Sequence, residues 1–296
     1  MSPAEEGSAG SARDGGPIAG GKPLRSKSDG PEVDLYDATY GSFATDLSRA
    51  VRARTYDEDI GQNGWLTAAE QDRFISWLGC GPEAEMLDVA CGSGGPALRI
   101  AARLGCRMTG VDIHEQGIAN ATAAARERGL AARTRFAVAD AALPLPFPDG
   151  SFDAITCIDA INHLPRRAGV LADWRRLLKP AGRLMFTDPI VVTGILTNEE
   201  IRIRSSIGLF LFAPPGEDER LLREAGLDLI RCDDATDNMA SVAGRWRAAR
   251  AERGDDLRRV EGDATFEGQQ NFLEVTARLA AERRLSRLAF LAARAS

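Results

Sequence analysis

Hydrophobic residues in the middle of the chain alternate between short runs typical of buried strands and stretches with helical spacing. Residues 86–89 are strand-like, and the apolar residues after Pro96 recur with the period of a helix. Gly92 and Gly94 lie between the two, where they allow a sharp turn and let a ligand approach backbone N–H groups. This strand, glycine loop and helix predict a site for a nucleotide-like cofactor.

The loop alone leaves the identity of the cofactor open. Gly92, Gly94 and Ala97 satisfy the pattern G-x-G-x-x-A, which is also the fingerprint of dinucleotide-binding loops. Asp112 ends the next apolar strand, where a carboxylate would bind the hydroxyls of a ribose. A methyl donor, a nicotinamide cofactor and a glycine turn without a ligand are therefore three open interpretations.

The alternation continues downstream and indicates a doubly wound α/β fold. A turn at 146–151 leads into a strand, and Pro180 and Gly182 end a later helix and begin another strand. Ligands in such sheets bind beyond the carboxyl ends of the strands. The glycine loop, Asp112, Asp140 and Ile158 all fall at strand ends, so we expect them to meet at one cleft.

Four stretches within about residues 85–190 closely resemble the class I S-adenosylmethionine-dependent methyltransferases: LDVACGSG, VDIHEQGI, FAVADAALPLPFPDGSFDAI and LLKPAGRLMF. The resemblance implies a Rossmann-like α/β sheet, mostly parallel with an antiparallel last strand, and S-adenosylmethionine as cofactor. It favours methyl transfer to a nitrogen or oxygen of a small metabolite. A nicotinamide-dependent oxidoreductase, which would not be expected to carry the last three stretches, and a non-catalytic methyltransferase-like protein are the alternatives.

The resemblance also implies which residues bind the cofactor. Nine of them lie at the strand ends: Asp88, Ala90, Gly92, Gly94, Asp112, Ile113, Asp140, Ala141 and Ile158. Asp112 is expected to accept hydrogen bonds from both ribose hydroxyls, Ile113 to pack on the adenine, and Asp140 to face the adenine amino group. Gln62 is a further expected contact, with the carboxylate of the cofactor. No metal ligand is predicted.

Methyl transfer requires alignment, exclusion of water and, for some acceptors, removal of a proton. His163 follows the fourth strand, and an imidazole titrates near physiological pH, so His163 is the expected general base. The equally open alternative is that His163 forms hydrogen bonds within its loop and shapes the pocket. Tyr36 is expected in a lid over the reacting groups.

Three more residues are expected to contact the substrate. Tyr40 and Trp65 belong to an N-terminal segment that can cover the cleft, although aromatic residues there also serve to attach helices to a core. Arg202 can hold a carboxylate or phosphate, whereas a surface position on an amphipathic helix is its alternative interpretation.

The chain divides into three predicted parts. Residues 1–32 have few large apolar side chains and are expected to be a disordered tail. Residues 33–80 form a helical cap that includes a capping box of Thr67 and Glu70. Residues 81–296 form the cofactor-binding domain, with helical insertions at about 190–216 and 236–283, the first containing a helix over 198–211.

Charge and composition narrow the class of partner. The net charge of -6 opposes a nucleic-acid groove, which needs a basic face. Five cysteines without a C-x-x-C pair indicate reduced thiols, and no apolar run is long enough to cross a bilayer. We therefore expect a cytoplasmic protein that binds a small-molecule substrate but no nucleic acid or membrane. A homodimer stays open.

Overall fold

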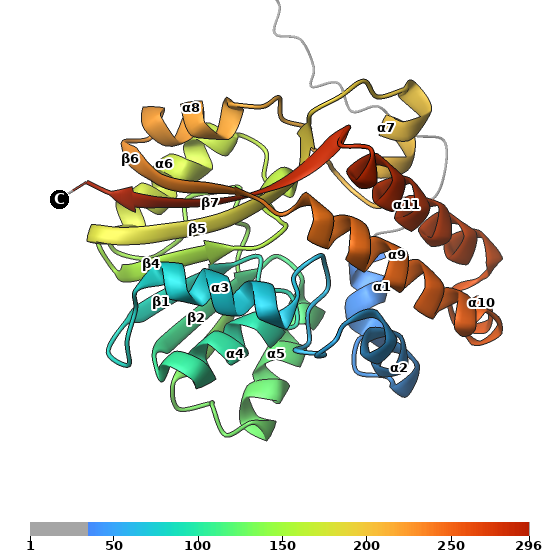
Figure 1. Ribbon diagram of the computed structural model, residues 1–296. Coiled ribbons are helices and arrows are strands. Elements are labelled where there is room, and N and C mark those ends of the chain that lie inside the picture. The colour runs from blue at the N-terminus through green and yellow to red at the C-terminus, as the bar shows by residue number, and fades with distance from the viewer. Residues whose placement is uncertain (1–34, 296) are drawn as a thin grey trace, which may run out of the picture. The chain divides into compact units, whose positions relative to one another are not determined.

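The computed structural model describes the main chain of residues 35–295 and the side chains from Thr39 to Ala295 (Figure 1). Seven strands of this part form one sheet in the order β3-β2-β1-β4-β5-β7-β6. The strands are β1 Glu85–Val89, β2 Arg107–Asp112, β3 Thr134–Val138, β4 Phe152–Cys157, β5 Leu178–Val192, β6 Leu227–Asp234 and β7 Leu285–Arg294. The predicted tail, 1–32, lies outside the described residues.

The pairing of the strands confirms the predicted sheet. Strands β1 to β5 pair in parallel, whereas β7 runs antiparallel to both of its neighbours, β5 and β6. The chain moves outward from β1 through β2 to β3 and then returns to β4 on the other side of β1. This reversal of strand order is where open α/β sheets bind their ligands.

Helices cover both faces of the sheet. One face carries α3 (Ala68–Leu78), α4 (Gly95–Leu104) and α5 (Glu115–Glu127), and the other carries α6 (Arg167–Leu177) and α8 (Glu217–Glu224) (Figure 1). Phe74 and Ile100 are buried in the core of the first face, while Trp174 and Leu222 are buried in that of the second. Fully burying one large apolar side chain stabilises a fold by roughly 1.5–3 kcal/mol, so each face anchors its helices firmly.

Additional helices lie near the carboxyl ends of the parallel strands. Besides α3, the cap contributes α1 (Leu35–Ser42) and α2 (Asp46–Thr55), and the insertion between β6 and β7 contributes α9 (Thr236–Glu252), α10 (Gly254–Glu261) and α11 (Asp263–Ala281). The helix α9 packs beside α2 (Figure 1). Trp65 of the cap is buried against Met239 of α9 and Phe272 of α11, so cap and insertion share one apolar cluster.

Two local predictions are wrong. The helix expected over 198–211 ends at Arg204, as α7 (Asn198–Arg204), because Ser205 and Ser206 follow and the Ser206 hydroxyl bonds the Ile203 carbonyl instead. Thr67 caps α3 as expected, but Glu70 does not complete the capping box. The Glu70 carboxylate turns away and pairs with the distant Arg287.

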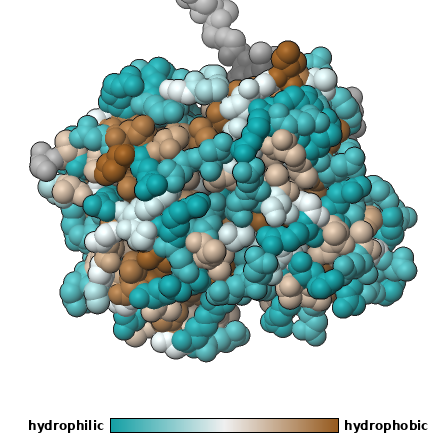
Figure 2. All heavy atoms as spheres, in the orientation of Figure 1, coloured by the Kyte–Doolittle hydropathy of each residue, from teal (hydrophilic) through white to brown (hydrophobic). Residues whose placement is uncertain are grey.

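The surface seen in Figure 2 is mostly hydrophilic, with small and separate hydrophobic areas. Large continuous apolar patches usually mark membrane or protein contacts, and this face presents none of them. Among the helices of residues 35–295, none combines the length and the apolar character needed to cross a membrane.

Candidate functional site

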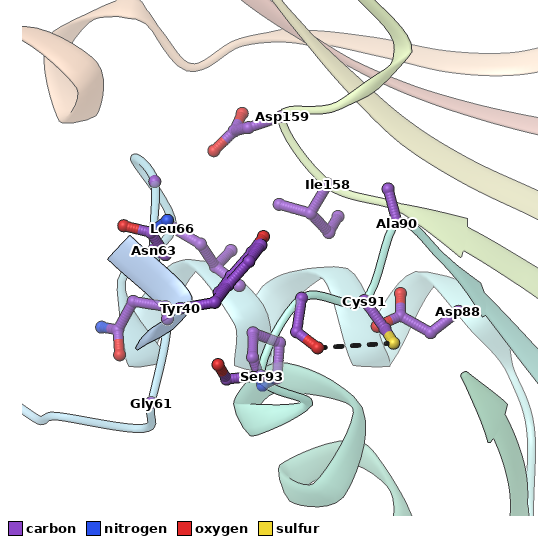
Figure 3. A pocket seen from close by; sticks show the side chains of 14 residues that line it. Tyr40, Gly61, Asn63, Leu66, Asp88, Ala90, Cys91, Ser93, Ile158 and Asp159 are labelled. Atoms are coloured by element: carbon purple, nitrogen blue, oxygen red, sulfur yellow. Dashed lines mark hydrogen bonds between the residues drawn. The ribbon is translucent and has the colours of Figure 1, made fainter. Parts of the chain in front are cut away.

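A pocket lies at the carboxyl ends of β1 and β4, beneath the cap (Figure 3). It is a cleft open to solvent, with about 510 Å³ of unoccupied space that includes its mouth. Its lining comes from the cap, the glycine loop and the turn after β4: Tyr40, Gly61, Gln62, Asn63, Gly64, Leu66, Asp88, Ala90, Cys91, Gly92, Ser93, Pro96, Ile158 and Asp159.

The floor of the pocket is the glycine loop that the sequence predicts. Ala90 and Gly92 both have left-handed backbone conformations, with φ of 57° and 54°. A Cβ on Gly92 would lie only 2.8 Å from the hydroxyl oxygen of Tyr40, so a side chain there would displace the Tyr40 ring. Gly94, also predicted, lies behind the floor as the N-cap of α4, where a Cβ would meet Ala121 at 2.6 Å.

Asp112 holds the glycine loop in place. Its buried carboxylate accepts hydrogen bonds from the backbone N–H of Gly92 at 2.8 Å and from that of His114 at 2.9 Å. A carboxylate offers about four acceptor positions, so two remain for hydroxyl groups of a ligand. Asp112 is therefore placed to fix the loop and still accept a ribose, although it is not among the lining residues.

Asp88 is a buried acid in the wall of the pocket. Its Oδ1 accepts a hydrogen bond from the Thr156 hydroxyl at 2.6 Å. Burial raises the pKa of Asp88 to about 7; the hydrogen bond from Thr156 opposes this shift and the negative charge of Asp112 adds to it. Asp88 can thus exist in either protonation state near neutral pH.

Cys91 of the glycine loop also lines the pocket. Its thiol lies 3.8 Å from the carbonyl oxygen of Gly92, the hydrogen bond drawn in Figure 3. Burial holds the pKa of the Cys91 thiol well above its usual value. The thiol therefore stays protonated, which is the state of an unreactive packing residue.

Tyr40 packs helix α1 of the cap against the glycine loop that forms the floor of the pocket. Its side chain is buried against the glycine loop, and its ring centroid lies 5.3 Å from that of His114. The Asn120 side chain of α5 donates to the Tyr40 carbonyl at 2.9 Å and to the Ser93 hydroxyl at 3.3 Å. Tyr40, expected to contact substrate, is thus anchored above the site of the cofactor.

The sequence gives no direct indication of Asp159, which follows Ile158 in the wall. Its backbone is left-handed, with φ of 55°, a strained conformation for a residue with a side chain. Its carboxylate pairs with Arg287, whose Nε lies 2.6 Å from Oδ1. The only sign of Asp159 in the sequence is that an acidic residue follows the end of a strand. Its partner Arg287 lies far away in the sequence and gives no local pattern.

His163 lies in a short 3-10 turn (Ile161–His163) and is not among the lining residues. Its Nδ1 donates to the Leu209 carbonyl at 2.7 Å, so Nε2 is the acceptor for the Asn162 amide at 3.2 Å. Burial lowers the pKa of His163 from its usual value. The imidazole is thus neutral at physiological pH, with both nitrogens in hydrogen bonds inside the protein.

Several other predicted site residues lie outside the pocket lining. Ile113 is 59% exposed beside β2, Asp140 is exposed and caps its own turn through Ala142, and Ala141 is buried next to it. Gln62 does line the pocket, but its amide bonds the Ile60 nitrogen and the Glu58 carbonyl of its own loop.

The remaining predicted residues belong to the cap and to α7. Trp65 packs between Trp246 and Phe272 rather than in the lining. Arg202 is exposed on α7 and pairs with Glu199 at 2.5 Å. Tyr36 lies on α1, with its side chain outside the described part of the structure.

Comparisons with known proteins identify the family. The family described as "Methyltransferase domain" matches residues 87–186. The chain is 33% identical over 185 residues to 27-O-demethylrifamycin SV methyltransferase of Amycolatopsis mediterranei, covering 61% of this chain and 67% of that protein. It is 34% identical over 217 residues to a sterol 24-C-methyltransferase of Gibberella zeae, covering 70% of this chain and 54% of that protein. The chain thus spans about half the length of this second relative.

The fold is also that of a solved structure. A cyclopropane synthase from Mycobacterium tuberculosis superposes with a TM-score of 0.75 and 17% identity, over 87% of this chain and 97% of that chain. A pocket at the strand ends of a doubly wound sheet, floored by a glycine loop, defines a nucleotide-cofactor protein. The chain belongs to the class I S-adenosylmethionine-dependent methyltransferases.

The residues present fit the cofactor of this family, S-adenosylmethionine. The floor has little room for a side chain at Gly92, and the Asp112 carboxylate behind it retains acceptor positions for ribose hydroxyls. The nicotinamide alternative, which depended on the same loop pattern, receives no support from the comparisons.

Proposed function

We propose that the protein transfers a methyl group from S-adenosylmethionine to a nitrogen or oxygen atom of a small metabolite. The observation that carries this proposal is the pocket in which the glycine loop, the turn after β4 and the cap meet. Its lining includes the acids Asp88 and Asp159 and no lysine or arginine, which suits a small molecule better than a polyanion. The two relatives described above are named for a rifamycin and for sterols, which are also small molecules.

When bound, S-adenosylmethionine supplies an activated methyl group on a positively charged sulfur. The residues of this chain then have three tasks. Asp112 and the glycine loop hold the nucleoside, Ile158 and Asp159 form the wall beyond β4, and Tyr40 covers the floor and excludes water. Ile113 and Asp140 stay proposed contacts of the adenine at the rim.

In this proposal, His163 does not remove the proton from the methyl acceptor. A histidine can act as a general base only through a free nitrogen lone pair within reach of the acceptor, and Nε2 of His163 already accepts from Asn162. We propose the alternative role, in which His163 ties the turn after β4 to Leu209 and Phe210, whose ring lies 4.7 Å away, edge to face. Alignment and desolvation then supply most of the rate.

The proposal is tested with S-adenosylmethionine labelled with ¹³C in the methyl group and an extract of small metabolites. We expect S-adenosylhomocysteine to form together with a labelled product whose carbon chemical shift is that of an N-methyl or O-methyl group. An Asp112→Ala variant serves as the control that should form less of both at limiting S-adenosylmethionine. A label on carbon would overturn the choice of acceptor atom, and no label in any product would overturn the proposed activity.

A further inference from the structure

A buried cluster of charges joins four distant segments behind the pocket wall. Arg287 of β7 is fully buried, and its Nη1 lies 2.7 Å from Oε2 of Glu70 in α3. Its Nε and Nη2 lie 2.6 Å and 3.3 Å from the two carboxylate oxygens of Asp159. Asn238 of α9 donates to the same Glu70 oxygen at 3.1 Å. Sheet, cap, insertion and pocket wall therefore meet at one guanidinium.

The carboxylate of Asp159 uses all its acceptor positions inside the protein. Besides the two bonds from Arg287, Oδ1 accepts from the Thr187 hydroxyl at 2.7 Å and Oδ2 accepts from the backbone N–H of Trp65 at 3.0 Å. Because a carboxylate offers about four such positions, none is left for a ligand or for a proton from an acceptor. Asp159 therefore has a structural role in the pocket wall and takes no part in the reaction.

The bonds of Asp159 fix two parts of the pocket lining. Its backbone N–H donates to the Thr187 hydroxyl at 2.7 Å, which holds the strained turn that carries Ile158. Its bond to the Trp65 nitrogen holds the cap turn that contributes Gly64 and Leu66. A strained conformation persists only where its surroundings determine it, and here they are Arg287 and Thr187.

We propose that Arg287 and Asp159 form a latch that sets the spacing between the cap turn and the turn after β4, and that Arg287 is a positioning residue for cofactor binding. Arg287 lies behind Asp159 and does not line the pocket, so it acts through Asp159. The latch deepens the proposed function, on which it rests, because the spacing it sets is that of the proposed cofactor pocket.

The replacement Asp159→Asn isolates the latch. An amide has one acceptor atom and two donor hydrogens, whereas every partner of Asp159 donates to it. The Thr187 hydroxyl can accept from the new NH₂ group with its second lone pair, but the Arg287 and Trp65 nitrogens can only donate. Either orientation of the amide thus sets its NH₂ group against at least one nitrogen donor, and the wall must move.

The test measures S-adenosylhomocysteine binding by calorimetry on the full chain, well below the melting temperature. Asp159→Asn should weaken binding about tenfold or more, as expected when buried hydrogen bonds are lost. Asp72→Asn is the matched control: Asp72 of α3 also pairs with an arginine, Arg99 of α4, at 2.6 Å, but does not line the pocket. Its affinity should stay within about twofold of wild type.

A second variant covers the case in which Asp159→Asn does not fold. Thr187→Val keeps the ion pairs and removes only the hydroxyl, so its affinity should fall severalfold while the circular dichroism spectrum is unchanged. Unchanged binding by either folded variant, alongside a wild type that binds, would overturn the latch alone. A wild type that does not bind S-adenosylhomocysteine would overturn both the latch and the proposed function.

Discussion

Replacing Asp88 by Asn should change how the stability of the protein depends on pH. Asp88 is 5% exposed on β1, and the Thr156 hydroxyl donates a hydrogen bond to its Oδ1 at 2.6 Å. Burial raises its pKa from 3.8 to about 7 in the folded protein. The amide oxygen of an Asn can accept the same hydrogen bond from Thr156, and an Asn does not ionise.

The sign of the effect follows from proton binding. Between about pH 4 and pH 7 the folded protein keeps a proton on Asp88 that the unfolded chain releases, so the free energy of unfolding falls as the pH rises. Above pH 7 both states are ionised and the loss is complete. A shift of about three pKa units at about 1.4 kcal/mol each gives a total of roughly 4 kcal/mol.

Denaturation by urea at several pH values between about 4.5 and 8 measures this loss for wild type and Asp88→Asn. The variant minus wild-type difference in the free energy of unfolding should increase by several kcal/mol across that range. Taking the difference cancels the contributions of other titrating groups. A difference that is flat or falls with pH would refute the assignment of a buried, protonated Asp88.

Asp72→Asn supplies a control at a group whose pKa shift has the opposite sign. The hydrogen bonds from Arg99 lower the pKa of Asp72 in the folded protein. Asp72 therefore contributes stability that is present above its ordinary pKa and is lost as the pH falls, so replacing it should cost stability at neutral pH and little in acid. Between pH 4.5 and 8 the Asp72→Asn difference should stay flat, because Asp72 titrates below its ordinary pKa of 3.8, in contrast to the rise expected for Asp88→Asn.

Three further predictions concern the pocket. Asp112→Ala should weaken S-adenosylhomocysteine binding at least about tenfold by calorimetry, because charged hydrogen bonds of about 1.5–3 kcal/mol are lost, and equal affinity would contradict the assignment of the β2 end. Gly92→Ala should destabilise the protein by about 1–2 kcal/mol, because its backbone is left-handed and its Cβ would press on Tyr40. Gly41→Ala is the control, because a Cβ there would have no atom within 4 Å. Equal melting temperatures of the two variants would argue against a rigid loop. His163→Ala should keep turnover within about tenfold, and a loss of 10²–10⁴-fold would restore the general-base interpretation.

The parts of the site that sequence could predict are those fixed by short-range geometry. The glycine loop, Asp88 and Asp112 lie at the ends of adjacent parallel strands, and the register of β1 with β2 brings them together whatever the rest of the chain does. Asp159 could not be predicted in the same way. Its role depends on Arg287, which is 128 residues away in the sequence and reaches it only because β7 inserts between β5 and β6.

Long-range contacts also explain where local rules fail. Thr67 and Glu70 have the spacing of a capping box, yet the Glu70 carboxylate is drawn to the buried Arg287, since an unpaired guanidinium there would cost more than an open cap. The ion pair that the buried Arg287 offers to Glu70 therefore outweighs the stabilisation of about 1 kcal/mol that a helix cap gives. Burial raises the pKa of Glu70 and Arg287 lowers it, with a net increase.

The division between sheet and additions bears on which acceptor the protein selects. The family match covers residues 87–186, which hold the glycine loop, Asp112 and Asp159 but neither the cap nor the insertion between β6 and β7. Relatives that share this part are named for different acceptors, a carbon of sterols in one and a 27-O-demethylrifamycin in the other. We therefore expect residues outside 87–186 to contribute to the choice of acceptor: the cap supplies part of the pocket lining, and the proposed latch between Asp159 and Arg287 joins the cap to the turn after β4.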